Sequence, residues 1–130
     1  MRQVCILVEG QTEEAVVKTL LIDAAEARGI YLTPIIVRTS LTPAGASRGG
    51  GHDLLSENTI EHLIRMIDDA SGPEKINNGE KTSPSKRILA LDPEYGKTST
   101  GISILREVGL AAVLDRCPVF AAWWRTLLSR

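Results

Sequence analysis

The 130-residue chain has few aromatic residues and only two cysteines. Aromatic residues make up 4% of the sequence, and Cys5 and Cys117 stand far apart, both in apolar surroundings. Neither cysteine has a neighbour at metal-ligand spacing, which argues against a cysteine-based metal site. We predict that both are buried, reduced thiols rather than a disulfide.

Long apolar runs and a dominant sign of charge are also absent. The first apolar run, Val4 to Val8, meets a glutamate after five residues, which is too short for the core of a signal peptide. No stretch approaches the roughly 20 apolar residues that span a bilayer, so we expect a cytoplasmic protein without a membrane segment. Fifteen Lys and Arg against sixteen Asp and Glu give a net charge of -1, so any contact with nucleic acid must be local.

The composition that remains is that of one ordinary globular domain, with 43% hydrophobic and 24% charged residues. We predict a single α/β domain in three parts. Residues 1–70 form an α/β half, residues 71–84 form a polar, turn-rich linker, and residues 85–130 form a mostly helical tail.

The α/β half begins with a parallel strand, helix, strand unit. The run Val4 to Val8 predicts a strand buried on both faces. Thr12 is a plausible N-cap of a helix that ends near Gly29, and residues 30–37 predict a second strand. Such an order implies a parallel crossover.

A second helix should follow a glycine-rich loop. Asp53 or Ser56 can cap it, and it should end near Asp69. The apolar residues at helical spacing should line its buried side: Leu55, Ile60, Leu63, Ile64 and Ile67.

In the tail we expect short helices over residues 101–108 and 111–116 and a last helix from Pro118. Trp123 and Trp124 are consecutive, so on a helix they point about 100° apart and one should be partly exposed. Together with neighbouring apolar residues, this tryptophan forms either a patch for a second subunit or part of the packing against the sheet.

Glu9 is the first candidate for chemistry, because ligands of open α/β sheets bind at the carboxyl ends of strands. A carboxylate there can hold a divalent metal or act as a general acid or base. Gly10 would let the backbone approach a phosphate, and the helix start at Thr12 would favour an anion. The alternative is an ordinary strand-to-helix turn with capping acids.

The segments ILVEGQTEE, GPEKINNG, TSPSKRILALDPEYGK and CPVFAAWWRTL resemble the Toprim-like family of unknown function called DUF4276. The resemblance covers nearly the whole chain. It implies a Toprim fold, in which a glutamate after the first strand works with aspartates after a later strand to bind Mg²⁺ for phosphodiester chemistry. Glu9 matches that glutamate, and the resemblance also implies an ATPase partner in defence against foreign DNA.

The sequence departs from that family pattern in its middle. An apolar strand ending in an aspartate-aromatic motif and a His-Glu-Phe-Glu segment are both missing, since MIDDAS passes directly to GPEKINNG. The chain thus resembles an internally shortened member. Phosphoryl chemistry on metal ions needs several converging carboxylates, so we expect weak or absent catalysis.

Asp92 and Glu94 could replace the missing acids if ILALDPEYG forms a strand. The alternative is that this stretch is helical, as the SPSK start favours. Asp68 and Asp69, at the exposed end of the second helix, are a weaker alternative. The candidate metal ligands are therefore Glu9, Asp92 and Glu94.

Basic residues could supply phosphate contacts beside Gly10 and Thr12. Arg48 lies in the glycine-rich loop, and Lys86, Arg87 and Lys97 lie in the tail. The alternative is a solvated surface that keeps the protein soluble. Two functions remain open: a Mg²⁺-dependent nuclease-like protein acting on nucleic acid, and a non-catalytic interaction module, such as a homodimer, that keeps the two ends of the fold.

Overall fold

The computed structural model describes residues 1–37, 55–76, 79–80 and 82–129. Its two strands, β1 (Arg2–Val8) and β2 (Ile30–Ile36), pair in parallel with Arg2 opposite Ile30. The helical stretch between them comprises α1 (Gln11–Val16), the π-helical η1 (Val17–Leu21) and α2 (Ile22–Glu26). The predicted parallel strand, helix, strand unit is confirmed.

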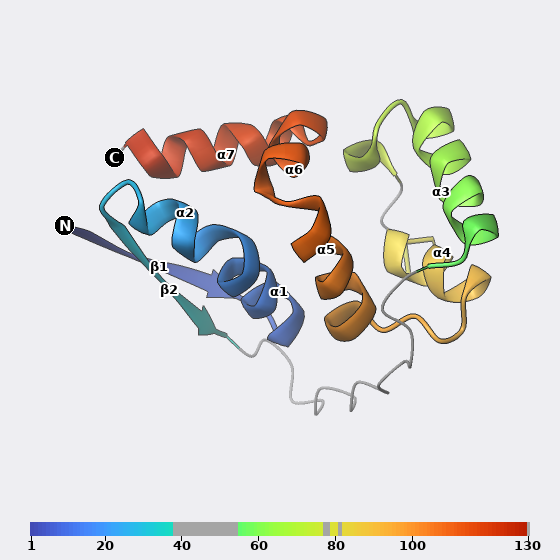
Figure 1. The fold of residues 1–130 in the computed structure, drawn as a ribbon, viewed down its shortest axis with the longest axis horizontal. Coiled ribbons are helices and arrows are strands. Elements are labelled where there is room, and N and C mark those ends of the chain that lie inside the picture. The colour runs from blue at the N-terminus through green and yellow to red at the C-terminus, as the bar shows by residue number, and fades with distance from the viewer. Residues whose placement is uncertain (38–54, 77–78, 81, 130) are drawn as a thin grey trace.

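The described chain after β2 is helical, as predicted. Its elements are α3 (Glu57–Ala70), the 3-10 turn η2 (Pro73–Lys75), α4 (Pro84–Leu91), the π-helical η3 (Lys97–Gly101), α5 (Ile102–Val108), α6 (Leu110–Arg116) and α7 (Pro118–Ser129). Figure 1 shows β1 and β2 at one end of the molecule, α3 and α4 at the other, and α5 between them. The structure thus has two regions: a body (residues 1–37 and 97–129) and an α3–α4 arm (residues 57–91).

The helix starts follow the capping signals in part. The Ser56 hydroxyl accepts a hydrogen bond from the Thr59 N–H at 3.2 Å, as expected of an N-cap. The prediction that Thr12 caps the first helix is wrong, because Gly10 occupies the N-cap position without a side-chain hydrogen bond. The Gly10 carbonyl accepts the first helical bond, from the Glu14 N–H at 3.1 Å. Thr12 therefore lies inside the first turn.

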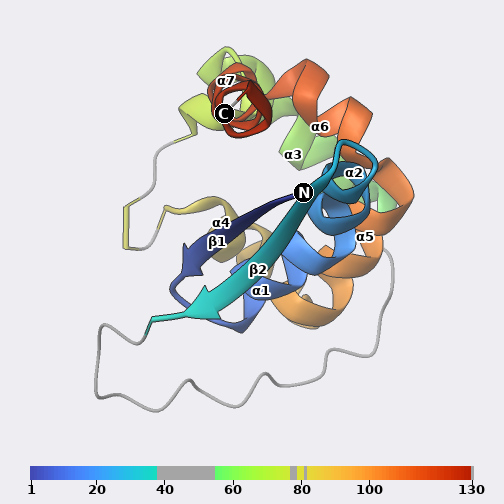
Figure 2. The same cartoon turned by 90° about the vertical axis from the view of Figure 1, so that its left-hand side faces the viewer.

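One face of the sheet carries the main core of the body. Apolar residues of β1 and β2 pack there against the first helices, and Trp124 of α7 closes the cluster: Val8, Val17, Leu20, Leu21, Ala25, Ile30, Leu32 and Trp124. Figure 2 shows α1 and α5 on the same side of the two strands. Trp123 is 41% exposed whereas Trp124 is 5% exposed, which confirms that one tryptophan of the pair is partly exposed.

The other face of the sheet is open within the described part of the chain. Leu7 is 70% exposed, and Tyr31 and Ile35 of β2 are also exposed. The predicted burial of the first strand on both faces is therefore wrong, because only its alternate residues meet the helical layer. Cys5 lies on the open face and is exposed, which corrects its predicted burial, whereas Cys117 is partly buried.

Two side chains connect distant elements. The Arg2 guanidinium donates through Nη2 to the Leu127 carbonyl, which joins β1 to the end of α7. The Glu74 carboxylate accepts from the Val119 N–H at 2.9 Å and from the Phe120 N–H at 3.0 Å. These amides belong to the first turn of α7, where backbone donors have no partner inside the helix. Glu74 therefore caps α7 and attaches the arm to the body.

The arm contributes little to the apolar core. Within the described ranges, all ten buried apolar residues belong to the body, and the buried residue of α3 is Thr59. The predicted burial of Ile60 and Ile64 is wrong, since they are 43% and 53% exposed. The buried face of α3 is instead the adjacent one, which carries Thr59. No helix in the described ranges is long and apolar enough to cross a membrane.

Candidate functional site

The candidate site lies where β1 passes into α1. Glu9 follows the last residue of β1 and is exposed, and Gly10 follows it in an extended conformation with φ −161°. A Cβ atom at Gly10 would lie 3.4 Å from Oε2 of Glu13, so the Glu13 carboxylate is beside the glycine. Two carboxylates, those of Glu9 and Glu13, therefore lie close in the chain to the start of α1.

The electrostatics of this helix start favour cations over free anions. Glu13 and Glu14 occupy the first turn of α1, where their charges complement the helix dipole. Glu14 also pairs with Lys18 at 3.5 Å, one turn further on. The positive end of the helix dipole is thus already neutralised in part by carboxylates of the protein itself. A phosphate at Gly10 and Thr12 would meet this negative charge unless a cation accompanied it.

A distant segment approaches the same end of α1. The Thr12 and Thr98 hydroxyl oxygens are 3.2 Å apart, which brings η3 next to the first turn of α1. The preceding residue, Lys97, is exposed. The hydrogen bond joins residues 86 positions apart, so no local pattern in the sequence predicts that Thr98 belongs to this site.

The η3 segment is shaped by a tyrosine that packs against a glycine. A Cβ atom at Gly101 would lie 2.9 Å from the Tyr95 hydroxyl oxygen, closer than real Cβ contacts come. Burial raises the pKa of the Tyr95 phenol above its usual value. Gly101 thus lets the Tyr95 ring lie over the start of α5, and this contact positions the segment that carries Lys97 and Thr98.

Asp92 and Glu94 follow a helix rather than a strand. Residues 84–91 form α4, so the alternative of a strand ending in paired acids is wrong and the helical alternative is confirmed. The Asp92 Oδ1 atom accepts from the Glu94 N–H at 3.2 Å, and the Asp92 carbonyl accepts from the Tyr95 N–H at 3.0 Å. The Asp92 side chain therefore closes a turn at the end of α4.

The carboxylates do not gather into a complete metal cage in the described part of the chain. No group of three or more His, Cys, Asp and Glu side chains is placed there to hold a metal ion. Asp68 and Asp69 are exposed in the last turn of α3, in the arm. A cation at Glu9 would need oxygen ligands from water or from a bound phosphate, which is a common arrangement for Mg²⁺.

The candidate phosphate-binding cations are spread over the chain. Arg87 Nε donates to the Thr82 carbonyl at 2.6 Å, which uses its guanidinium at the start of α4. Lys86 is exposed on the same helix. Arg48 lies outside the described residues. Lys97, in contrast, directly precedes Thr98, whose hydroxyl contacts that of Thr12. Among the described candidates it is therefore the basic residue nearest in sequence to this contact.

Comparison with known proteins identifies a family for more than half of the chain. Residues 52–128 match the model of DUF4276, a domain of unknown function. The matched span contains α3 to α7 except the last residue of α7, whereas β1, Glu9 and α1 precede it. No curated protein and no solved structure matches the chain. The chain therefore belongs to the DUF4276 family.

Proposed function

We propose that this DUF4276 protein works as a non-catalytic interaction module that binds through surfaces its own fold leaves open. The observation that carries the proposal is the outer face of the sheet, where Leu7 and Ile35 form an exposed apolar pair and Tyr31 is exposed four residues before Ile35 on the same face. Leu7 is directly opposite Ile35 in the strand register. Contiguous exposed apolar side chains on a sheet mark contact sites for other molecules. A second copy of the chain that covers this face would form a homodimer.

A Toprim-like, metal-dependent phosphodiesterase is the second candidate. It is supported by Glu9 at the carboxyl end of a parallel strand and by the Thr12 to Thr98 contact beside it. In this candidate Glu9 would hold Mg²⁺, with Asp92 and Glu94 as further acids, and a bound Mg²⁺ would supply Lewis-acid chemistry for phosphodiester hydrolysis. Gly10, Thr12, Arg48, Lys86 and Arg87 would contact phosphates of a nucleic acid.

This second candidate includes further expectations of the Toprim-like resemblance. The chain would be an internally shortened member of a nuclease-like group, with weak or no activity of its own. It would act beside an ATPase partner in defence against phage DNA. The incomplete set of carboxylates at Glu9 is the reason that we place it second.

Titration of the full chain with Mg²⁺ and Mn²⁺ separates the two candidates. The interaction module predicts no saturable metal binding and no chelator-sensitive cleavage of plasmid DNA. Glu9→Gln tests the site, and Glu26→Gln, at an exposed position of α2, is its matched control. Saturable binding or DNA cleavage that Glu9→Gln removes and Glu26→Gln keeps would overturn the module and support the phosphodiesterase.

The homodimer is tested by sedimentation over a range of protein concentrations. Leu7→Ser removes an exposed apolar side chain from the open face and should leave the fold intact. The homodimer predicts an assembly that Leu7→Ser weakens. Gln3→Ser, on the same face of β1, is the control because it removes no apolar side chain. A chain that is monomeric at all concentrations contradicts the homodimer.

A further inference from the structure

Helix α3 exposes two isoleucines to solvent. They lie beside the face of the helix that packs against the rest of the protein. Ile60 and Ile64 are one turn apart and are 43% and 53% exposed. Thr59, which directly precedes Ile60, is 1% exposed. The apolar face of a surface helix normally covers the core of its own domain. Here α3 packs through the Thr59 side and leaves the two isoleucines open.

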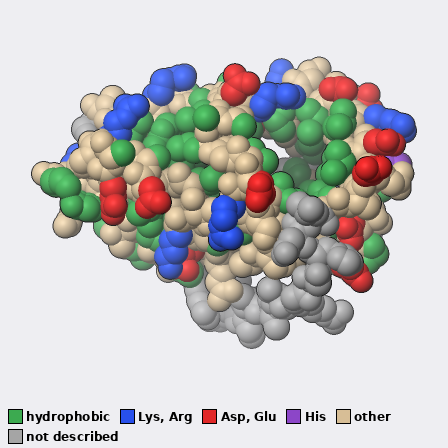
Figure 3. Space-filling view, in the orientation of Figure 1, with side chains coloured by type: hydrophobic (Ala, Val, Ile, Leu, Met, Phe, Trp, Pro, Cys, Tyr) green, Lys and Arg blue, Asp and Glu red, His purple; other side chains and the backbone are tan. Residues whose placement is uncertain are grey.

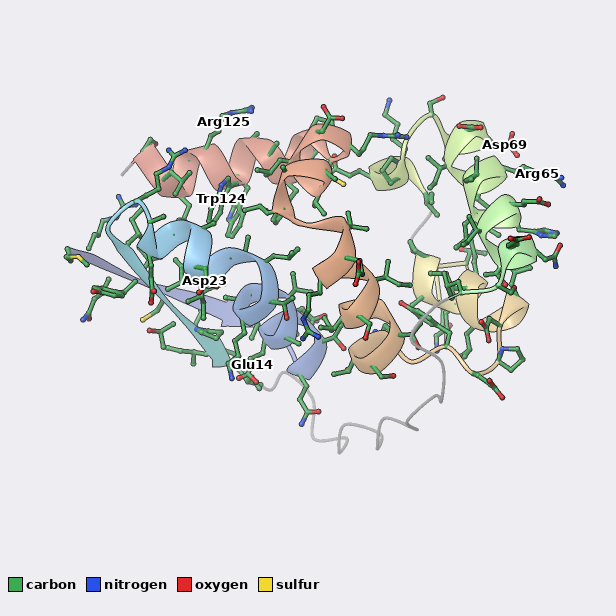
Figure 4. All side chains as sticks on the ribbon, in the orientation of Figure 1. Glu14, Asp23, Arg65, Asp69, Trp124 and Arg125 are labelled. Atoms are coloured by element: carbon green, nitrogen blue, oxygen red, sulfur yellow. The ribbon has the colours of Figure 1, made fainter. Side chains whose placement is uncertain are left out.

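Carboxylates flank this pair along one side. At 100° per residue, Glu57, Glu61 and Asp68 fall within about 100° of the direction of Ile60, on the same side as Ile64. All three are exposed, and none has an ion-pair partner among the described residues. We call Ile60, Ile64 and these three acids the α3 strip. Figure 4 shows Arg65 and Asp69 at the outer edge of the molecule, away from α5 and α6.

A pocket extends the α3 strip toward the body. Its volume is about 370 Å³, and Asp68 belongs to both features. Its other lining residues come from the end of α3, from η2 and from the end of α6: Ile67, Ser71, Gly72, Pro73, Asp115 and Arg116. Figure 3 shows hydrophobic side chains around a hollow between the arm and the body. The pocket adds one charge of each sign, the Asp115 carboxylate and the Arg116 guanidinium, so the net negative charge of the surface comes from the α3 strip.

We propose that the α3 strip and this pocket bind a basic amphipathic helix of a partner protein. The exposed isoleucines at i and i+4 form an apolar stripe along α3, against which the apolar face of another amphipathic helix can pack. The three unpaired acids of the strip attract Lys or Arg on the flank of such a helix and repel nucleic-acid phosphates. The inference rests on the proposed interaction module and names its partner chemistry.

The test uses two synthetic helical peptides of about 15 residues with leucines at positions i, i+3, i+4 and i+7. One peptide carries lysines beside the leucines, and the matched peptide carries glutamates there. Binding of each peptide to the full chain is measured by fluorescence anisotropy at low and high salt. The lysine peptide should bind and weaken as salt rises, whereas the glutamate peptide should not bind.

Substitutions in the α3 strip test whether the peptide binds there. Ile60→Ser with Ile64→Ser should weaken the lysine peptide about tenfold or more, and so should Glu57→Gln with Glu61→Gln and Asp68→Asn. Asp69→Asn, on the outer edge of α3, is the matched control and should bind as the parent does. The acidic side chains are exposed, so their variants should change the urea midpoint little, whereas the two isoleucine substitutions should lower it modestly. Circular dichroism should show that the helices remain formed in both.

Three results of the peptide-binding measurements would overturn the inference. They are equal binding of both peptides, no binding of the lysine peptide, and unchanged binding by the strip variants. A dimer that Ile64→Ser dissociates would also overturn it, because a second copy would then cover the strip. These outcomes do not depend on the metal and DNA-cleavage measurements, so failure of the inference and failure of the interaction module are told apart.

Discussion

The body and the α3–α4 arm use similar helices in different ways. The stretch from α1 to α2 buries Val17, Leu20, Leu21 and Ala25 against the sheet and α7. The α3 helix is of similar length and amphipathic, yet its buried residue is a threonine. Burial of a leucine or isoleucine contributes about 1.5 to 3 kcal/mol, so the body holds most of the apolar stabilisation. The comparison shows that the arm leaves apolar side chains exposed that a helix of the body would bury.

The arm depends on its ends rather than on a core. Ser56 caps α3 at one end, and Ser71 ends it in a left-handed conformation with φ 63°. An isolated helix of this length is marginal in water, so capping and attachment decide whether α3 stays formed. The Glu74 carboxylate then holds the arm to α7. We therefore expect substitutions in the two regions to differ strongly in their effect.

The largest expected difference is between matched apolar truncations. Leu21→Ala should lower the free energy of unfolding by about 3 kcal/mol, because Leu21 is 2% exposed and the cavity would be in the core. Ile64→Ala should lower it by less than about 1 kcal/mol, because half of this side chain is already in water. Urea denaturation measures both. Equal losses would mean that the arm has a core of its own.

The next effect concerns the contact that shapes η3 within the body. Gly101→Ala should lower the free energy of unfolding by about 1 kcal/mol, because its Cβ would lie 2.9 Å from the Tyr95 hydroxyl oxygen. Removing that oxygen with Tyr95→Phe should restore most of the loss in the double variant. Without such rescue, the cost of Gly101→Ala has another origin and the packing of Tyr95 does not position η3.

A smaller effect is expected where the arm meets the body. Glu74→Ala removes the acceptor for two amides of α7 and should lower the free energy of unfolding by about 1 kcal/mol. Glu107→Ala, at an exposed position of α5, is the control and should change it less. Thermal unfolding measures both variants. A Glu74→Ala protein as stable as the control would show that the carboxylate does not hold the arm.

The smallest effect is on thiol chemistry in the body. Burial and the negative charge of Glu74 raise the pKa of the Cys117 thiol, while Arg116 lowers it. Since the thiolate is the reactive form, Cys117 should be alkylated more slowly than exposed Cys5. Glu74→Gln should lower the pKa of Cys117 and shift its alkylation profile to lower pH. If the pH profile of Cys117 alkylation does not shift, the Glu74 charge does not influence the thiol.

Much of the secondary structure follows from local signals in the sequence. The two parallel strands, the Ser56 cap and the helical tail are predicted from apolar spacing and capping residues, which act within a few positions. Which face each element buries is not local. Leu7 and Ile64 sit in patterns that normally face a core, but their exposure depends on whether another layer lies opposite.

The candidate site shows the same limit. Glu9 and Gly10 stand out in the sequence because a strand, a carboxylate and a helix start follow one another. The Thr12 to Thr98 contact and the Glu74 cap of α7 each join residues far apart in the chain. Asp92 and Glu94 follow an apolar run that fits a strand and a helix equally in pattern, and a proline start decides for the helix.

Native-state hydrogen exchange tests the central claim, that the α3–α4 arm is held apart from the core of the body. We predict that amides of α3 exchange through an opening of clearly lower free energy than amides of β1, β2 and the helix between them. Binding of the lysine peptide should slow the exchange of α3 alone. If α3 exchanges only with global unfolding, at the same free energy as the strands, the arm and the body are one cooperative unit and the account is wrong.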